Sequence, residues 1–97
     1  MFRHIVLLTL APDTSDDDRS TLLAGLASLP PAIPEIAEYR FGTDAGLAEG
    51  NATIGIVADF ADQAAYEVYR DHPVHRQVIE ERILPFLADR RAIQIAS

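Results

Sequence analysis

Three histidines and one tyrosine are the side chains of this chain best suited to chemistry. His72 and His75 lie on either side of Pro73, and Tyr69 comes six residues before His75. His4 lies far from them, near the start of the chain. A neutral imidazole can take up a proton near pH 7, and a tyrosine hydroxyl can donate a hydrogen bond to a developing oxyanion. These residue types predict general acid–base chemistry if the fold brings His4 to Tyr69 and His75.

Each histidine also allows a structural interpretation. Proline favours the first position of a helix, so Pro73 puts His75 near the third helical position. Positive potential at that helix end disfavours the imidazolium, which suits a general base. His72 fits better as a side chain that hydrogen-bonds the backbone at the helix junction. For His75 and for His4, which lies in an apolar segment, the structural and the catalytic interpretations both stay open.

Other kinds of site have little support in the sequence. The chain has no cysteine, which excludes disulfides, thiolate nucleophiles and Cys-based zinc sites. The acidic run after Ser15 is typical of a capped helix start rather than of a metal site. Arg70 next to Asp71 is interpreted as a surface ion pair rather than as a ligand for an anion. There is no glycine-rich phosphate loop. We therefore expect neither a metal nor a cofactor.

Composition limits the partners and the location. The formal charge is −7, from 15 acidic and 8 basic residues, which argues against nucleic acid and anionic membranes as partners. No apolar run approaches the roughly 18 residues of a transmembrane helix. The apolar run after Met1 is short and leads into Pro12 and an acidic segment, so it resembles a strand more than a signal peptide. We expect a cytoplasmic protein.

Hydrophobic periodicity predicts the elements that must position these residues. Strands are expected over 2–10, 36–41, 52–60 and 90–96, with a helix after Ser15, a short helix after Asp62 and another from Pro73. The order strand, helix, strand, strand, helix pair, strand is the split βαβ pattern. The prediction is an α+β, ferredoxin-like protomer: one domain over 1–97, with a four-stranded antiparallel sheet and helices on one face.

The first strand suggests how the protomer associates. Both of its faces are apolar, which is typical of a strand that is buried on both sides. If the helices cover one sheet face, we expect the other face to carry Val6, Leu8, Ile54 and Ile56. Leaving that face in water would forfeit about 25 cal/mol per Å² of apolar area. The sequence therefore predicts a homodimer in which two sheets pack face to face around a barrel-like core.

Several stretches resemble one known family. Arg3-His4-Ile5-Val6-Leu7, the acidic helix start, the proline-rich turn and above all His72-Pro73-Val74-His75 resemble the stress-responsive dimeric α/β-barrel (Dabb) family over essentially the whole chain. The resemblance implies a ferredoxin-like protomer and a homodimer whose sheets form a barrel. One plant branch, olivetolic acid cyclase, closes a linear polyketide by aldol condensation without metal or cofactor. Its site residues fall on His4, Tyr69 and His75.

Several functions are compatible with the sequence. The first is a stress-responsive domain that binds a small apolar or polyketide-like molecule, in a pocket lined by Val6, Leu8, Ile56, Ala58, His72 and Phe86. The alternative is a cofactor-independent cyclase or lyase, which needs a cavity lined by His4, Tyr69 and His75. A structural barrel would instead fill that space with side chains. A monooxygenase of the antibiotic-biosynthesis type is disfavoured, because the chain has no tryptophan and a single asparagine, Asn51.

Overall fold

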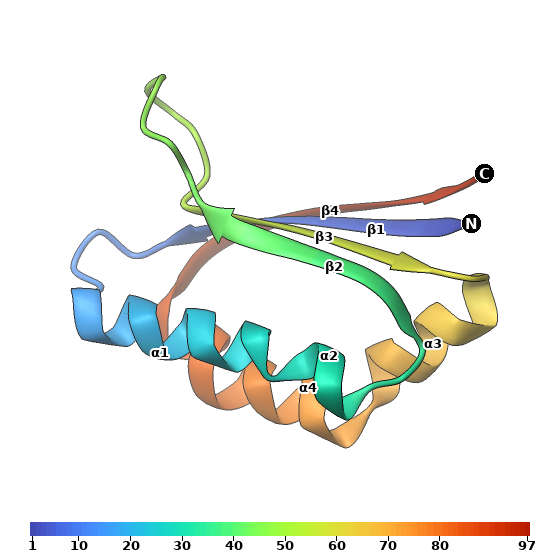
Figure 1. The fold of residues 1–97 in the computed structure, drawn as a ribbon. Helices are drawn as coiled ribbons and strands as arrows, with labels where there is room; N and C mark the ends of the chain where they lie inside the picture. Colours follow the sequence, from blue (N-terminus) through green and yellow to red (C-terminus); the bar gives the residue numbers. More distant parts are fainter.

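The computed structural model describes all residues 1–97 and shows two layers, an antiparallel sheet with every helix on one face (Figure 1). The strands lie in the order β2-β3-β1-β4. This arrangement confirms the predicted ferredoxin-like fold. The strands are β1 (Phe2–Leu10), β2 (Ile36–Thr43), β3 (Ile54–Phe60) and β4 (Leu87–Ala96).

Capping residues start the two main helical regions where the sequence predicts. The Ser15 hydroxyl accepts a hydrogen bond from the Asp18 N–H at 3.1 Å, and the Asp62 carboxylate accepts one from the Ala65 N–H at 2.9 Å. Each bond satisfies one of the free N–H groups of a first helical turn. The helical segments are α1 (Asp16–Ala27), α2 (Leu29–Ala32), α3 (Gln63–Asp71), α4 (Pro73–Val78), a π-helical turn η1 (Ile79–Ile83) and a 3₁₀ turn η2 (Leu84–Phe86).

The helix-facing side of β1 differs from the prediction. Phe2, His4, Val6, Leu8 and Leu10 are buried. Val6 pairs with Ile56 and Leu8 pairs with Ile54, so all four line the face that the helices cover. The expectation that Val6, Leu8, Ile54 and Ile56 form the uncovered face is therefore wrong. Side chains alternate along a strand, so once His4 packs against α3, Val6 and Leu8 must follow it.

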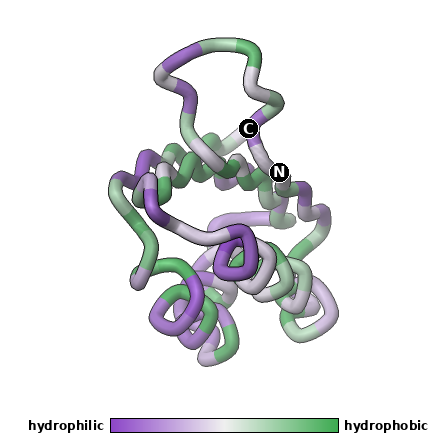
Figure 2. The backbone as a smooth tube through the Cα atoms, turned by 90° about the vertical axis from the view of Figure 1, so that its left-hand side faces the viewer, coloured by the Kyte–Doolittle hydropathy of each residue, from purple (hydrophilic) through white to green (hydrophobic).

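The opposite sheet face is nevertheless apolar, with different residues. Ile5 pairs with Ile93 across β1 and β4. Leu7, Ile93 and Ile95 keep 46%, 55% and 44% of their surface exposed, which is a large exposure for aliphatic side chains. Hydrophobic segments run through the sheet layer, above the helices, in Figure 2. The loop between β2 and β3 projects from this side, away from the helices (Figure 1).

The main core lies between the sheet and the helices. Its largest fully buried side chains include Leu22, Leu26, Leu29, Ile33 and Phe60. The leucines of α1 therefore pack inward. The short helix α2 follows directly, because proline is tolerated in the first turn of a helix. None of the helices combines the length and the apolar character that crossing a bilayer requires.

Candidate functional site

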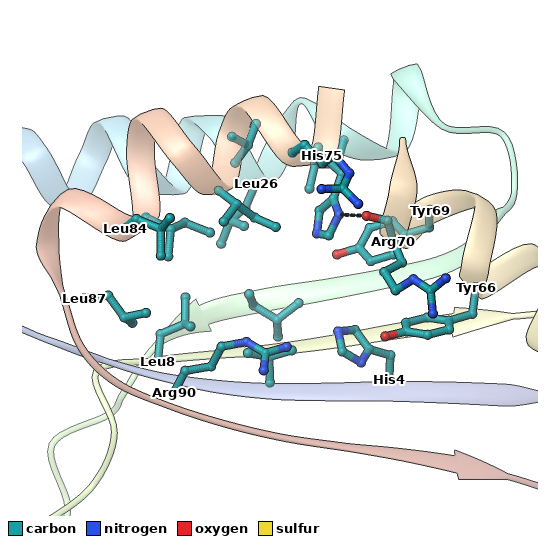
Figure 3. A pocket seen from close by; sticks show the side chains of 17 residues that line it. His4, Leu8, Leu26, Tyr66, Tyr69, Arg70, His75, Leu84, Leu87 and Arg90 are labelled. Atoms are coloured by element: carbon teal, nitrogen blue, oxygen red, sulfur yellow. Dashed lines mark hydrogen bonds between the residues drawn. The ribbon is translucent and has the colours of Figure 1, made fainter. Parts of the chain in front are cut away.

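A cavity of about 340 Å³ lies between the sheet and the helices. His4 reaches it from β1, Tyr69 from α3 and His75 from α4 (Figure 3). Twelve of its 17 lining residues are hydrophobic, which makes it a mainly apolar chamber. The fold thus brings together three residues that are up to 71 positions apart in the sequence.

The ring of His75 is held in one tautomer. Its Nδ1 lies 3.1 Å from the backbone carbonyl oxygen of Arg70 (dashed in Figure 3). A carbonyl only accepts hydrogen bonds, so Nδ1 carries the proton of the neutral ring and Nε2 keeps its lone pair. Nε2 has no hydrogen-bond partner in the protein. His75 can therefore accept a proton from a molecule in the cavity.

Burial keeps His75 neutral. It lowers the pKa of His75, and the positive charges of Arg76 and Arg90 act in the same direction. The hydrogen bond to the Arg70 carbonyl opposes this shift. The direction is the one predicted from the helix end, but the main cause is the loss of water around the ring.

His4 is held in the opposite tautomer. The side-chain amide of Gln94, directly across the β1–β4 pair, donates to Nδ1 of His4 at 2.9 Å. The neutral ring then carries its proton on Nε2. Burial lowers the pKa of His4 to about 4, with a further contribution from Arg90. His4 is therefore a neutral hydrogen-bond donor at neutral pH.

Tyr69 lies between the two histidines. Its ring centroid is 4.1 Å from that of His75 and 6.1 Å from that of His4. Burial raises the pKa of Tyr69 to about 12, so its hydroxyl stays protonated and can donate. One turn earlier, Tyr66 packs 5.0 Å from the ring of His4. The site combines one neutral base with two neutral donors.

The other predicted pocket residues divide into two groups. Val6, Leu8 and Ile56 line the cavity, whereas Ala58, His72 and Phe86 do not. Ala58 lies beside His4 but is fully buried in the core. Phe86 packs against the core from η2.

His72 has the structural position that the junction suggests. Its Nδ1 accepts a hydrogen bond from the Val74 N–H at 3.1 Å and so caps α4. The side chain of His72 therefore hydrogen-bonds the backbone and does not line the cavity.

Several lining residues had no signal in the sequence. The predicted ion pair between Arg70 and Asp71 is confirmed at 3.0 Å, yet Arg70 also lines the cavity, together with Arg76 and Arg90. Arg90 could be placed only with the β1–β4 register. The π-helical turn η1 adds Ile79 and Ile83 to the wall, consistent with the frequent occurrence of π-turns at functional sites.

One further polar group lies beside the site. The hydroxyl of Tyr39, on β2, is buried close to Tyr69. Burial raises the pKa of Tyr39, and the nearby Tyr69 adds to the shift. No group of three or more His, Cys, Asp or Glu side chains is arranged to hold a metal.

Solved structures of the same fold cover almost the whole chain. A dimeric ferredoxin-like protein of unknown function from Thermobifida fusca is 41% identical, with a TM-score of 0.90 over 99% of this chain and 90% of the other. A Dabb family protein from Mesorhizobium loti is 25% identical, with a TM-score of 0.83 over 99% and 95% of the two chains. A hydroxynitrile lyase from Passiflora edulis shares the fold at 20% identity, with a TM-score of 0.85 over 97% and 90%.

None of the curated proteins matches the sequence. The family comparison, in contrast, spans nearly every residue that builds the sheet, the helices and the cavity. Residues 2–96 match the model of the stress responsive A/B barrel domain, and the chain therefore belongs to the Dabb family.

Proposed function

We propose that this chain forms a homodimer in which each protomer binds a small carbonyl compound and performs cofactor-independent acid–base chemistry on it. The observation that carries the proposal is the fixed tautomer of His75. Its Nδ1 is committed to the Arg70 carbonyl, which leaves a basic Nε2 in a mainly apolar cavity. This chemistry first requires a base within hydrogen-bond reach of the substrate, with a pKa that leaves it unprotonated at the working pH.

The two donors complete the reaction. Nε2 of His75 removes a proton from a carbon next to a ketone, and the electron pair of that C–H bond moves to the ketone oxygen. Tyr69 and His4 donate hydrogen bonds to the resulting enolate oxygen. The enolate carbon then attacks a second carbonyl of the same molecule, which forms the new carbon–carbon bond. The alkoxide produced takes back the proton from the His75 imidazolium, so atoms and charge balance.

A lyase reaction would use the same groups to break a carbon–carbon bond instead of forming one. The hydroxynitrile lyase from Passiflora edulis shares the fold, and by its name it acts on hydroxynitriles. In such a cleavage His75 takes the hydroxyl proton, a carbonyl forms, and the adjacent carbon–carbon bond breaks with its electron pair leaving on cyanide. The imidazolium then returns the proton, so that hydrogen cyanide and a carbonyl compound are released. The base and donor set of this cavity is suited to either direction, so both substrate classes belong in the test.

Homodimer formation is supported independently of the chemistry. The relative from Thermobifida fusca, at 41% identity, is described as dimeric. The sheet face opposite the helices exposes Leu7, Ile93 and Ile95, whose burial would be favourable. We propose that two protomers pack through this face.

The catalytic proposal predicts a large effect at His75. Linear polyketide-like β-diketones and aromatic cyanohydrins would be incubated with the protein, and consumption followed by chromatography with mass detection. His75→Gln should lower kcat/KM by about 10²-fold or more, the usual contribution of a general base. The matched control is His72→Asn, a nearby histidine outside the cavity whose replacement keeps a capping acceptor.

Each result has a defined meaning. Turnover that is unchanged in His75→Gln would remove His75 from the role of base. Binding of these compounds without turnover would favour the second candidate, a ligand-binding domain without catalysis. That candidate has a specific observation in its favour, the hydrophobic character of 12 of the 17 lining residues.

A further inference from the structure

The charge of the cavity wall is opposite to that of the chain. The sequence carries 15 acidic and 8 basic residues, and all eight basic residues are arginines. Arg70, Arg76 and Arg90 line this cavity, whereas no aspartate or glutamate does. A protein with a formal charge of −7 therefore gathers three of its eight cations around one chamber.

These charges are only partly compensated. Arg70 and Arg76 share the carboxylate of Asp71, at 3.0 and 3.4 Å, and Glu67 acts on Arg70 from one turn earlier. Three guanidinium groups against two carboxylates leave an excess of positive charge at the wall. The side chains of Arg70 and Arg76 keep 51% and 61% of their surface exposed and Arg90 is also exposed, so this charge lies at the rim of the apolar cavity, where it attracts an anion that approaches from solvent.

Arg90 is the exception among the arginines. The other seven each hydrogen-bond a carboxylate or, for Arg82, the carbonyl of Thr21. The guanidinium of Arg90 has no such partner and forms no ion pair. The N–H groups of its guanidinium are therefore free for a ligand. Two of them lie parallel, as a bidentate hydrogen-bonded pair with a carboxylate requires.

The register directs Arg90 toward the site. Arg90 on β4 pairs with Leu8 on β1, four residues along the same strand face as His4. Its side chain extends along the sheet toward the reactive groups in Figure 3. From this position the positive charge of Arg90 adds to the effect of burial and lowers the pKa of both His4 and His75.

We infer that the ligand of this cavity is an amphipathic carboxylate, whose apolar body lies among the hydrophobic lining residues while its carboxylate binds Arg90. This inference rests on the proposed function in one respect only, that the cavity binds a small molecule. It adds the chemical class of that molecule and assigns Arg90 as the residue that selects it.

Matched small probes test the charge requirement. Octanoate and octanamide have the same apolar chain and differ in the charge of the head group, whereas acetate has the charge without the chain. Each would be titrated into the isotope-labelled full chain and followed by NMR, with the ring signals of His4 and His75 as reporters of the cavity. Octanoate should bind about tenfold or more tightly than octanamide, because a charged hydrogen-bonded pair is lost with the amide. Acetate should bind at least about tenfold more weakly than octanoate.

The neighbouring arginine provides the control variant. Arg90→Gln should remove the preference for octanoate over octanamide. Arg91→Gln should retain it, because Arg91 pairs with Leu7 on the opposite sheet face and is already bound to Asp89 at 3.2 Å. Both positions are exposed, so neither substitution is expected to disturb folding. Circular dichroism and thermal unfolding would verify this. Because Arg91 lies on the sheet face proposed as the dimer interface, sedimentation velocity would verify that Arg91→Gln has the oligomeric state of the wild type.

The outcomes separate this inference from the proposed function. Equal binding of octanoate and octanamide in the wild type, or a preference that survives Arg90→Gln, would overturn the carboxylate assignment while leaving the cavity as a binding site. Acetate binding as tightly as octanoate would overturn the amphipathic character of the ligand. If none of the probes shifts the signals of His4 and His75, both the carboxylate ligand and the binding cavity are rejected.

Discussion

His4 and His75 are neutral for the same reason but offer different nitrogens to the cavity. The Gln94 amide donates to Nδ1 of His4, whereas Nδ1 of His75 faces the Arg70 carbonyl. One ring is left with a free donor and the other with a free acceptor. An acid–base site needs such a complementary pair. Lowered pKa values alone would not create it, because the contact at Nδ1 of each ring decides which nitrogen carries the proton.

The neutrality of His4 should appear in the pH dependence of stability. Its pKa is about 4 in the folded protein and 6.5 as the reference value. Between these values the unfolded chain binds the proton and the folded chain does not, so stability rises with pH from about 4 to 6.5. With His4 only 4% exposed, this shift corresponds to roughly 3 kcal/mol of unfolding free energy. Urea unfolding at several pH values would measure it.

His4→Gln is the comparison that isolates this contribution. The substitution keeps a neutral polar side chain but removes the titration, so its stability should vary less with pH in this window. Both proteins would be compared at equal protomer concentration, because dimer stability depends on concentration. The carboxyl of Asp59, whose pKa is lowered by Arg3, titrates at lower pH in both proteins. Parallel pH curves for the two proteins would contradict the burial of a neutral His4.

At the scale of elements, the α3–α4 junction positions His75, the proposed base. Pro73 ends α3 by restricting His72 to an extended conformation and is itself the first residue of α4. Across this junction, the ring of His75 reaches back to the carbonyl of Arg70, near the end of α3. The α3–α4 junction thus determines both the direction of α4 and the tautomer of His75.

The cap at this junction should contribute measurably to stability. His72→Ala removes the acceptor of the Val74 N–H and should lower the unfolding free energy by about 1 kcal/mol, the usual value for a lost N-cap. His72→Asn supplies an acceptor again and should recover most of that loss. Chemical denaturation of the two variants would measure the difference. If Asn is as destabilising as Ala, the role of His72 lies elsewhere than in the cap.

The sequence was most informative where a local pattern determines structure. Ser15, Asp62 and Pro73 mark helix starts through bonds within a few residues, and these elements lie where predicted. The covered face of β1 was predicted wrongly, because both faces are apolar and alternation alone does not say which one meets the helices. His4 held the missing information, since its proximity to Tyr69 fixes the face of Val6 and Leu8.

The cavity residues show the same limit of what local sequence patterns can predict. His4, Tyr69 and His75 could be proposed together because they match a family pattern, and they do line one cavity. Arg90 could not, because its position depends on the β1–β4 register, which is a contact between the two ends of the chain. Long-range pairing of this kind leaves no local signature in the sequence.

At the scale of the molecule, the two sheet faces lie in different environments. The face toward the helices forms the core and the cavity, and the opposite face leaves aliphatic side chains in water. Ile5 and Ile93 face each other there beside Leu7, in the middle of the β1–β4 pair. A two-fold axis near this cluster would bring the same residues of two protomers together, as a symmetric dimer requires.

The dimer proposal predicts that charge on this face separates the protomers. Leu7→Glu combined with Ile93→Glu places two carboxylates per protomer where two copies would meet, and like charges in a desolvated interface are costly. Sedimentation velocity at micromolar concentration should give a dimer for the wild type and a monomer for the double variant.

The matched control for this experiment is Ala24→Glu combined with Ala64→Glu. Both alanines are exposed, on α1 and α3, and the helices lie on the side of the sheet away from the proposed interface, so this control adds the same two carboxylates per protomer outside the interface. It should leave the dimer intact, which separates an effect of the sheet face from an effect of net charge on a chain that already carries −7. A wild-type protein that sediments as a monomer would reject the dimer. A double variant that remains dimeric would instead move the interface away from the β1–β4 face, because two buried carboxylates per protomer could not remain there without partners.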